Sequence, residues 1–117
     1  MAHATPQGDL CEYLRPEQWE ERIAGLNADF VLLGHTHIPA MRTFGKTTVV
    51  NPGSVGLARD GGGEACYAVV EGGQPHLRRV SYDVERTVAG LQAAPLPPHV
   101  IARLTEVLRP TPSAQNS

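Results

Sequence analysis

Glycine and proline interrupt this chain so often that only short helices and strands fit between them. The 117 residues include 12 Gly and 10 Pro, and both residue types break regular structure. A chain of this length forms one domain at most, and its core is sizeable only if the whole chain contributes. The sequence therefore predicts one domain of brief elements joined by many turns.

Charge and cysteine content argue against several classes of protein. The 12 Asp and Glu outnumber the 10 Lys and Arg, which disfavours nucleic-acid and anionic-membrane binders. Cys11 and Cys66 form no CxxC pair, so neither a disulfide framework nor a cysteine metal site is indicated. No apolar run approaches the ~20 residues of a bilayer span, and the first residues lack a secretory signal pattern. We expect a cytoplasmic protein.

Apolar periodicity predicts the helices and strands. The expected elements are helices over residues 16–27, 84–91 and 98–108, a buried strand over 29–33, and hairpins over 41–50 and 65–82. Trp19 is expected in the core, and Asp83 is expected to cap the helix that follows it. The polar residues 110–117 are expected to form a disordered tail.

Two histidines directly follow the predicted strand, in Gly34-His35-Thr36-His37. Residues two apart on an extended backbone point to the same side, so both imidazoles would face one ion or two adjacent ions. Imidazole is the commonest ligand for zinc and suits other transition metals. Two solvent-facing loop histidines would show the same spacing, so the wider sequence must decide between these interpretations.

Further motifs occur on both sides of this pair. In chain order the motifs are Ala2-His3-Ala4-Thr5-Pro6, Glu12-Tyr13-Leu14, Gly34-His35-Thr36-His37-Ile38-Pro39, Asn51-Pro52-Gly53-Ser54-Val55-Gly56, Arg59-Asp60-Gly61 and Tyr82-Asp83-Val84-Glu85-Arg86. Together they resemble the C-terminal half of the calcineurin-like metallophosphoesterases, in particular the small bacterial and archaeal phosphodiesterase branch. The resemblance implies an α/β fold, the C-terminal part of a four-layer α/β/β/α sandwich, over residues 1–109.

The resemblance also implies a site and a reaction. Members of the family hold two divalent transition metal ions (manganese, iron, cobalt, nickel or zinc), and a hydroxide between the ions attacks the phosphorus of a phosphoester substrate. By position, His3 and His35 match ligands of the second metal, and His37 matches a ligand of the first. Arg59 is a candidate for binding the substrate phosphate, although a solvated loop arginine is the alternative.

The acidic part of the family's site has no counterpart in this sequence. The family's Asp-x-His, its Gly-Asp with the bridging carboxylate and its Gly-Asn-His are absent, and Gly8-Asp9 follows His3 instead of preceding it. Without a bridging carboxylate two dications repel each other strongly. We predict that the isolated chain does not assemble the two-metal site and hydrolyses phosphoesters negligibly. At most, the three histidines would gather on one weakly bound zinc ion.

The sequence thus predicts a chain that supplies three histidine ligands to a metal-dependent phosphoesterase whose complete domain is longer. Two alternatives remain within the fold: a non-catalytic scaffold, like the phosphoesterase-like subunit of retromer, and a truncated inactive remnant. An unrelated small HxH metal-binding domain is a third alternative. If strands of the sheet are missing, exposed edges and an uncovered apolar face favour self-association.

Overall fold

The computed structural model describes residues 1–111, which form two β-sheets with flanking helices. In chain order the elements are the 3₁₀ helix η1 (Pro16–Gln18), α1 (Trp19–Ile23), β1 (Phe30–Leu32), β2 (Ala40–Phe44), β3 (Thr47–Asn51), β4 (Ala65–Glu71), β5 (Gln74–Val80), α2 (Val84–Ala93) and α3 (Pro98–Leu108). This mixed α/β arrangement confirms the predicted fold class.

The first sheet has the strand order β1-β3-β2. β3 lies between a parallel neighbour, β1, and an antiparallel neighbour, β2. Gly45 has a φ of 61°, whereas Lys46 keeps a negative φ, as in a type II′ turn, and this turn closes the predicted β2–β3 hairpin. The central strand β3 is the most deeply buried of the three because both of its edges are paired.

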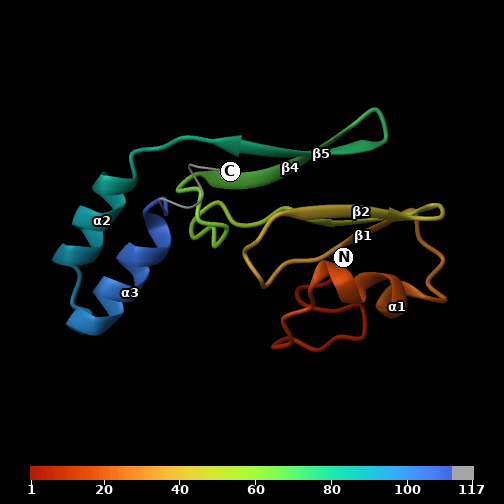
Figure 1. Ribbon diagram of the computed structural model, residues 1–117, viewed down its shortest axis with the longest axis horizontal. Helices are drawn as coiled ribbons and strands as arrows, with labels where there is room; N and C mark the ends of the chain where they lie inside the picture. The colour runs from red at the N-terminus through yellow and green to blue at the C-terminus, as the bar shows by residue number, and fades with distance from the viewer. Residues whose placement is uncertain (112–117) are drawn as a thin grey trace.

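The two faces of this sheet meet different partners. Val31 pairs with Val49 in the sheet register, and both belong to a buried cluster with Trp19 and Ile23 of α1. The neighbouring pair of residues in the register, Leu32 and Val50, lines a groove beneath the β4–β5 hairpin. Figure 1 shows the resulting layers, with α1 on one side of the three strands and β4–β5 on the other.

The predicted helix over residues 16–27 is wrong in length. It consists of η1 and α1 and ends at Ile23, because Ala24 has an extended ψ of 129° and Gly25 has a φ of 85°. The left-handed conformation at Gly25 turns the chain away from the helix. Leu26, which the helical period would have placed in the core, is therefore 41% exposed.

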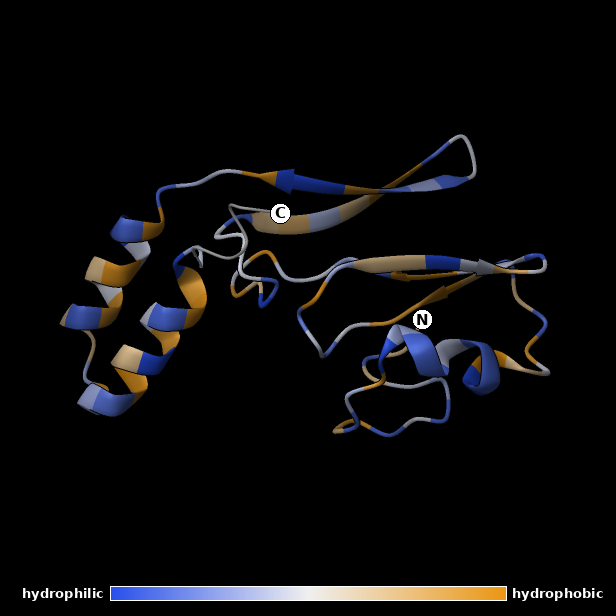
Figure 2. Cartoon of the chain, viewed as in Figure 1, coloured by the Kyte–Doolittle hydropathy of each residue, from blue (hydrophilic) through white to orange (hydrophobic). Residues whose placement is uncertain are grey.

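The second sheet is the antiparallel β4–β5 hairpin alone. Gly72 and Gly73 both have positive φ values, 58° and 74°, which is the requirement of a two-residue type I′ turn. In β4 only the first residues, Ala65 and Cys66, are buried, and in β5 only Pro75 is. Most of β5 is exposed and hydrophilic (Figure 2).

The last two helices pack on each other beyond the end of the sheets (Figure 1). As predicted, Asp83 caps α2, because its carboxylate accepts the backbone N–H of Arg86 at 3.2 Å. Val88 and Leu108 are the buried residues of α2 and α3, and apolar residues alternate with polar ones along both helices (Figure 2). The backbone N–H of Thr111 donates to Gly61 at 2.9 Å; the remainder of the expected tail, 112–117, lies outside the described residues.

The chain is more extended than a typical domain of its length. Its radius of gyration is 16.1 Å, and its extents are 47 × 29 × 24 Å, whereas a compact domain of this size has a radius of about 13 Å. Within residues 1–111 no helix has both the length and the apolar character needed to cross a bilayer.

Candidate metal centre

Two backbone segments bring histidines to the same edge of the first sheet. Residues 1–3 run alongside β1: Ala2 N–H donates to Leu32 O at 2.8 Å, and Gly34 N–H donates to His3 O at 2.7 Å. Both segments advance in the same direction along these contacts. Since adjacent parallel segments end at one edge, where α/β proteins bind ligands, His3 and His35 emerge side by side.

The two imidazoles contact each other directly. His3 Nε2 lies 3.0 Å from His35 Nδ1, and the ring centroids are 4.9 Å apart in an edge-on arrangement. His35 Nε2 lies 3.2 Å from the carbonyl oxygen of Cys11. A carbonyl oxygen only accepts hydrogen bonds, so His35 Nε2 carries the hydrogen and Nδ1 presents its lone pair toward His3.

The backbone of the histidine loop is not extended, contrary to the sequence-based expectation. His35 and His37 have φ values of 74° and 61°, and Thr36 N–H donates to Gly34 O at 2.9 Å, which closes a γ-turn centred on His35. Non-glycine residues rarely adopt positive φ, and such strain is concentrated at functional sites. The premise that placed both imidazoles on one side of a strand therefore fails.

His37 is held at a different place from the His3–His35 pair. Its Nδ1 lies 2.8 Å from the carbonyl oxygen of Leu57, so Nδ1 donates and Nε2 keeps a lone pair free for a ligand. Within residues 1–111 no group of three or more His, Cys, Asp or Glu side chains is placed to hold a metal ion. The structure thus brings together two of the three predicted ligands and does not form the three-histidine zinc site.

The side chain of Asn51 fastens the histidine loop to the end of β3. Asn51 is buried, and its Nδ2 donates to Gly34 O at 3.1 Å and to Thr36 Oγ1 at 3.0 Å. Its Oδ1 accepts the N–H of Gly53 at 3.0 Å, and Gly53 has a φ of 83°, the value expected at the third position of a type II turn. Through Asn51 and Gly53 this motif therefore has a structural role, since it forms the turn and holds the histidine loop.

Arg59 lies next to the histidine loop. Its backbone N–H donates to His37 O at 2.9 Å, while its side chain is exposed. Arg59 and Arg103 of α3 line a pocket of about 350 Å³ together with Ile38. The guanidinium of Arg59 is thus exposed at this pocket, and only its backbone contacts His37.

The carboxylates that a two-metal site needs are engaged elsewhere. Asp9 accepts backbone N–H groups within its own loop, and Asp83 caps α2. Asp60 forms an ion pair with Arg79; the hydrogen bond to Asp60 is the main cause that raises the pKa of Arg79. None of these three carboxylates is directed at the His3–His35 pair.

An apolar groove of about 720 Å³ separates the two sheets and extends to His3. Its walls include Leu32 and Val50 on one sheet and Tyr67 and Val70 on the hairpin. Cys66 closes the groove at the base of the hairpin, and burial raises the pKa of its thiol. The groove therefore offers apolar contact beside the candidate metal centre rather than further ligands.

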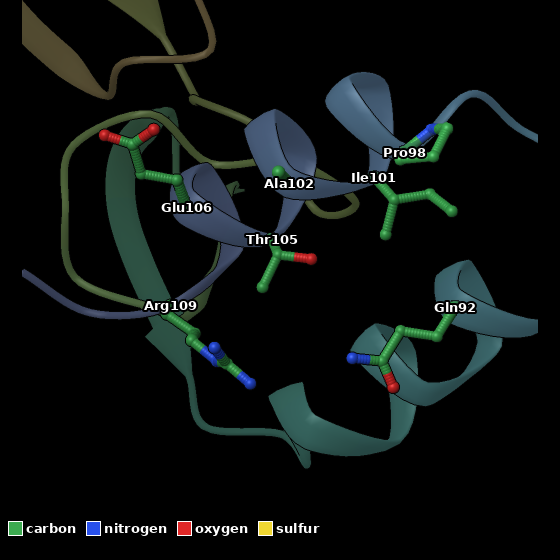
Figure 3. Close-up of a pocket in the computed structure, with 7 residues that line it drawn as sticks. All are labelled: Gln92, Pro98, Ile101, Ala102, Thr105, Glu106 and Arg109. Carbon is green, nitrogen blue, oxygen red and sulfur yellow. The ribbon is translucent and has the colours of Figure 1, made fainter.

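A second pocket, of about 640 Å³, lies between α2 and α3 (Figure 3). Gln92, Thr105 and Arg109 supply polar groups to its wall. The Arg109 guanidinium is already paired with Glu85 at 2.7 Å, and no histidine lines this pocket. It carries no part of the chemistry suggested by the histidine motif.

Sequence reasoning did not foresee what surrounds His35. The contact with the Cys11 carbonyl and the stacked ring of Tyr13, whose centroid lies 4.4 Å away, come from the loop after His3. The one available signal was Asp9, a residue type that commonly turns the backbone by binding N–H groups two and three residues ahead. The two remaining histidines, His76 and His99, are exposed.

Comparison with known proteins places this geometry in a family. Residues 6–74 match the model of the calcineurin-like phosphoesterase superfamily domain. An uncharacterized protein of Methanocaldococcus jannaschii is 27% identical over 122 aligned residues, which cover 89% of this chain and 49% of that protein. The chain spans about half the length of the relatives it matches.

Solved structures agree with the sequence match. The crystal structure of a metallophosphoesterase from Sphaerobacter thermophilus superposes with a TM-score of 0.77 at 24% identity and covers 90% of this chain and 53% of that one. A hypothetical protein from Pyrococcus horikoshii gives 0.67 at 21% identity, with coverage of 88% and 44%. These likenesses show a shared fold, and with the family match over more than half of the sequence they establish that this chain belongs to the calcineurin-like phosphoesterase superfamily.

Proposed function

We propose that this chain supplies the histidine side of a metal-dependent phosphoesterase centre. The observation that carries the proposal is the His3–His35 pair, with Nε2 and Nδ1 3.0 Å apart at the ends of adjacent parallel segments. Two nitrogens that share one ion at zinc–imidazole bond lengths lie about 3 Å apart. Superfamily membership supports the same kind of function.

The donor set fits a transition metal. His35 presents a lone pair on Nδ1, and a change of tautomer at His3 frees its Nε2. Imidazole donors suit zinc, manganese, iron, cobalt and nickel. When bound, such an ion supplies Lewis-acid stabilisation of phosphoryl oxygens and lowers the pKa of bound water.

The other predicted residues have supporting positions in this proposal. His37, whose Nδ1 donates to the Leu57 carbonyl and whose Nε2 is available, is proposed to serve a different ion, as the family resemblance implies. Arg59, next to His37 in the backbone network, is proposed to bind and orient an anionic phosphoester. Phosphodiesters are the proposed substrate class, because of the phosphodiesterase branch that the motifs resemble.

Metal uptake tests the proposal directly. We expect calorimetric titration of the full chain with Zn²⁺ alone to show one weak site that His3→Ala and His35→Ala abolish. The exposed His76→Ala and His99→Ala variants are matched controls, and both should bind as the wild type does. Uptake that survives both His3→Ala and His35→Ala would refute the proposed centre.

Hydrolysis is expected only when the missing acidic ligands are supplied. The sequence contains no counterpart of the family's bridging carboxylate, so the chain alone should hydrolyse an aryl phosphodiester at the background rate in the presence of Zn²⁺ or Mn²⁺. Metal-dependent hydrolysis by the pure chain that His35→Ala removes would contradict this expectation.

A non-catalytic interaction module is the second candidate function. It is favoured by the apolar groove and by the absence, within residues 1–111, of any group of three metal-binding side chains. The titration distinguishes the two: a chain that takes up neither Zn²⁺ nor Mn²⁺ while remaining folded would favour the interaction module.

A further inference from the structure

The loop that follows His3 encloses the ring of His35, and we propose that Tyr13 is a positioning residue that orients this imidazole toward a metal ion shared with His3. The inference rests on the proposed function for the presence of the metal. The Tyr13 ring stacks on His35, with centroids 4.4 Å apart and planes 28° apart. Tyr13 is 60% exposed, so its ring is not part of the buried core and the stack on His35 is the ring contact on which the inference rests.

The His35 ring is held on three sides. Its Nδ1 faces His3, its Nε2 meets the Cys11 carbonyl at 3.2 Å, and its face lies against Tyr13. The carbonyl fixes the tautomer, because only a protonated Nε2 can donate to it. The stacked ring opposes rotation of the imidazole out of its plane, a rotation that would turn Nδ1 away from His3.

The loop that carries these contacts is itself anchored. One carboxylate oxygen of Asp9 accepts the N–H of Cys11 at 2.8 Å and that of Glu12 at 3.1 Å. The Glu12 carboxylate forms an ion pair with Arg22 of α1. Leu14, the residue after Tyr13, belongs to the buried core cluster. The Cys11 carbonyl and the Tyr13 ring therefore occupy defined places relative to the sheet.

Orientation of a ligand ring has a measurable consequence. Groups that fix the tautomer and orientation of a ligating histidine change metal affinity by about 10–100-fold when they are removed. Tyr13 acts through its ring face, since no hydrogen bond of its hydroxyl contributes to these contacts. A phenylalanine should therefore replace it fully, whereas an alanine should not.

Calorimetry with Zn²⁺ alone tests the inference on the full chain. A Cys11→Ser background removes an exposed thiol that would compete for zinc and keeps the backbone carbonyl. We expect Tyr13→Ala to weaken Zn²⁺ binding about tenfold and Tyr13→Phe to retain it. Tyr82→Ala, a change at another partly exposed tyrosine, is the matched control and should bind as the background does.

A second measurement needs no metal. Long-range ¹H–¹⁵N correlation spectra show which nitrogen of His35 carries the proton. We expect Nε2–H in the wild type and in Tyr13→Phe. In Tyr13→Ala the imidazole is free to rotate away from the Cys11 carbonyl, so we expect a mixture of tautomers. Asp9→Asn, which keeps the acceptor oxygen, should behave as the wild type, whereas Asp9→Ala should resemble Tyr13→Ala.

The outcomes separate the two proposals. If the wild type takes up no Zn²⁺, the proposed function fails, and the spectra still decide whether Tyr13 orients His35. If Tyr13→Ala keeps both the affinity and the His35 spectrum of the wild type, the positioning role is overturned. If Tyr13→Phe lowers the Zn²⁺ affinity as much as Tyr13→Ala does, the positioning role is also overturned, because the stacked ring face would then not be what orients His35.

Discussion

The first sheet and the β4–β5 hairpin bury their apolar residues to very different degrees. Strand β3 of the first sheet is almost entirely buried, and Val31 and Val49 pack against Trp19 of α1. In the hairpin, Val70 is 58% exposed and Val80 is 50% exposed. Both regions contain apolar residues in their strands, so the difference lies in what covers them.

This comparison shows that a strand pattern becomes a core only when both faces and edges have partners. The first sheet has α1 on one face and the groove and hairpin on the other, whereas no helix within residues 1–111 covers the outer face of the hairpin (Figure 1). A two-stranded hairpin alone is marginally stable in water. Its position therefore depends on the contacts at its base, where Cys66 N–H donates to Ser54 O at 2.9 Å.

The largest expected difference between the regions comes from truncating one side chain in each. Trp19 is 1% exposed, so Trp19→Ala should lower the free energy of unfolding by about 3–5 kcal/mol. Val70→Ala on the hairpin should change it by less than ~0.5 kcal/mol. Urea unfolding followed by circular dichroism measures both, because the first variant lacks the single tryptophan. An equal decrease in the free energy of unfolding for Trp19→Ala and Val70→Ala would contradict the difference between the two regions.

The second largest effect on stability is expected at Gly53, where the first sheet meets the base of the β4–β5 hairpin. Gly53 has a φ of 83°, and an added Cβ would lie 2.9 Å from the Cβ of Cys66 and 3.0 Å from Cδ of Pro39. Gly53→Ala should therefore cost about 2–4 kcal/mol from backbone strain and overpacking. Gly56→Ala, where a Cβ meets open space, is the control and should be nearly neutral by the same urea measurement. A Gly53→Ala variant as stable as this control would show that the hairpin base is not tightly held.

Within the first sheet, loss of Asn51 should have a smaller effect that is concentrated in the histidine loop. Asn51→Ala removes the hydrogen bonds that Asn51 donates to Gly34 O and Thr36 Oγ1 and the one that it accepts from the N–H of Gly53, at a cost of about 1–3 kcal/mol. Asn27→Ala, which removes an exposed hydrogen bond to Lys46, should cost less than ~0.5 kcal/mol. Thermal unfolding compares the two, and amide spectra should show changes at residues 34–37 for Asn51→Ala alone.

The smallest effect is expected at the exposed ion pair between the last two helices. The hydrogen bond from Arg109 is the main cause that lowers the pKa of Glu85. A carboxyl group with a lowered pKa stabilises the fold at pH values above its pKa in the unfolded chain, which is about 4.3. This contribution is lost as the pH falls through the pKa of the group in the folded chain. Glu85→Gln should remove this loss of stability at acid pH, because Gln does not titrate. The effect should be small, because exposed ion pairs contribute little to stability. Unfolding curves between pH 7 and 3 measure the dependence of the free energy of unfolding on pH, and Glu71→Gln is the matched control. The prediction is contradicted if Glu85→Gln keeps the same pH dependence as the wild type and the control.

Local pattern predicted most of the elements but not their lengths. The β2–β3 and β4–β5 hairpins, the Asp83 cap and the helix that ends at Leu108 were predicted from turn, cap and periodicity signals, and the structure confirms them. The helix after Pro16 was predicted too long, because Gly25 interrupts a pattern that periodicity alone would continue. Burial along β5 was not predictable, because it depends on whether another layer covers the strand.

The sequence by itself determined the family and the residue types of the candidate centre, because the order of motifs such as Gly34–Pro39 and Asn51–Gly56 depends only on the chain. Tertiary structure alone decided which histidines meet. The γ-turn at His35 and the left-handed backbone at His37 separate two neighbours in sequence, whereas sheet pairing places His3 within 3.0 Å of His35. The physical reason is that spacing fixes side-chain direction only on a regular backbone. This loop is instead held by residues distant in sequence: Asn51 Nδ2 donates to Gly34 O, and the carbonyl oxygens of Cys11 and Leu57 accept from the rings of His35 and His37.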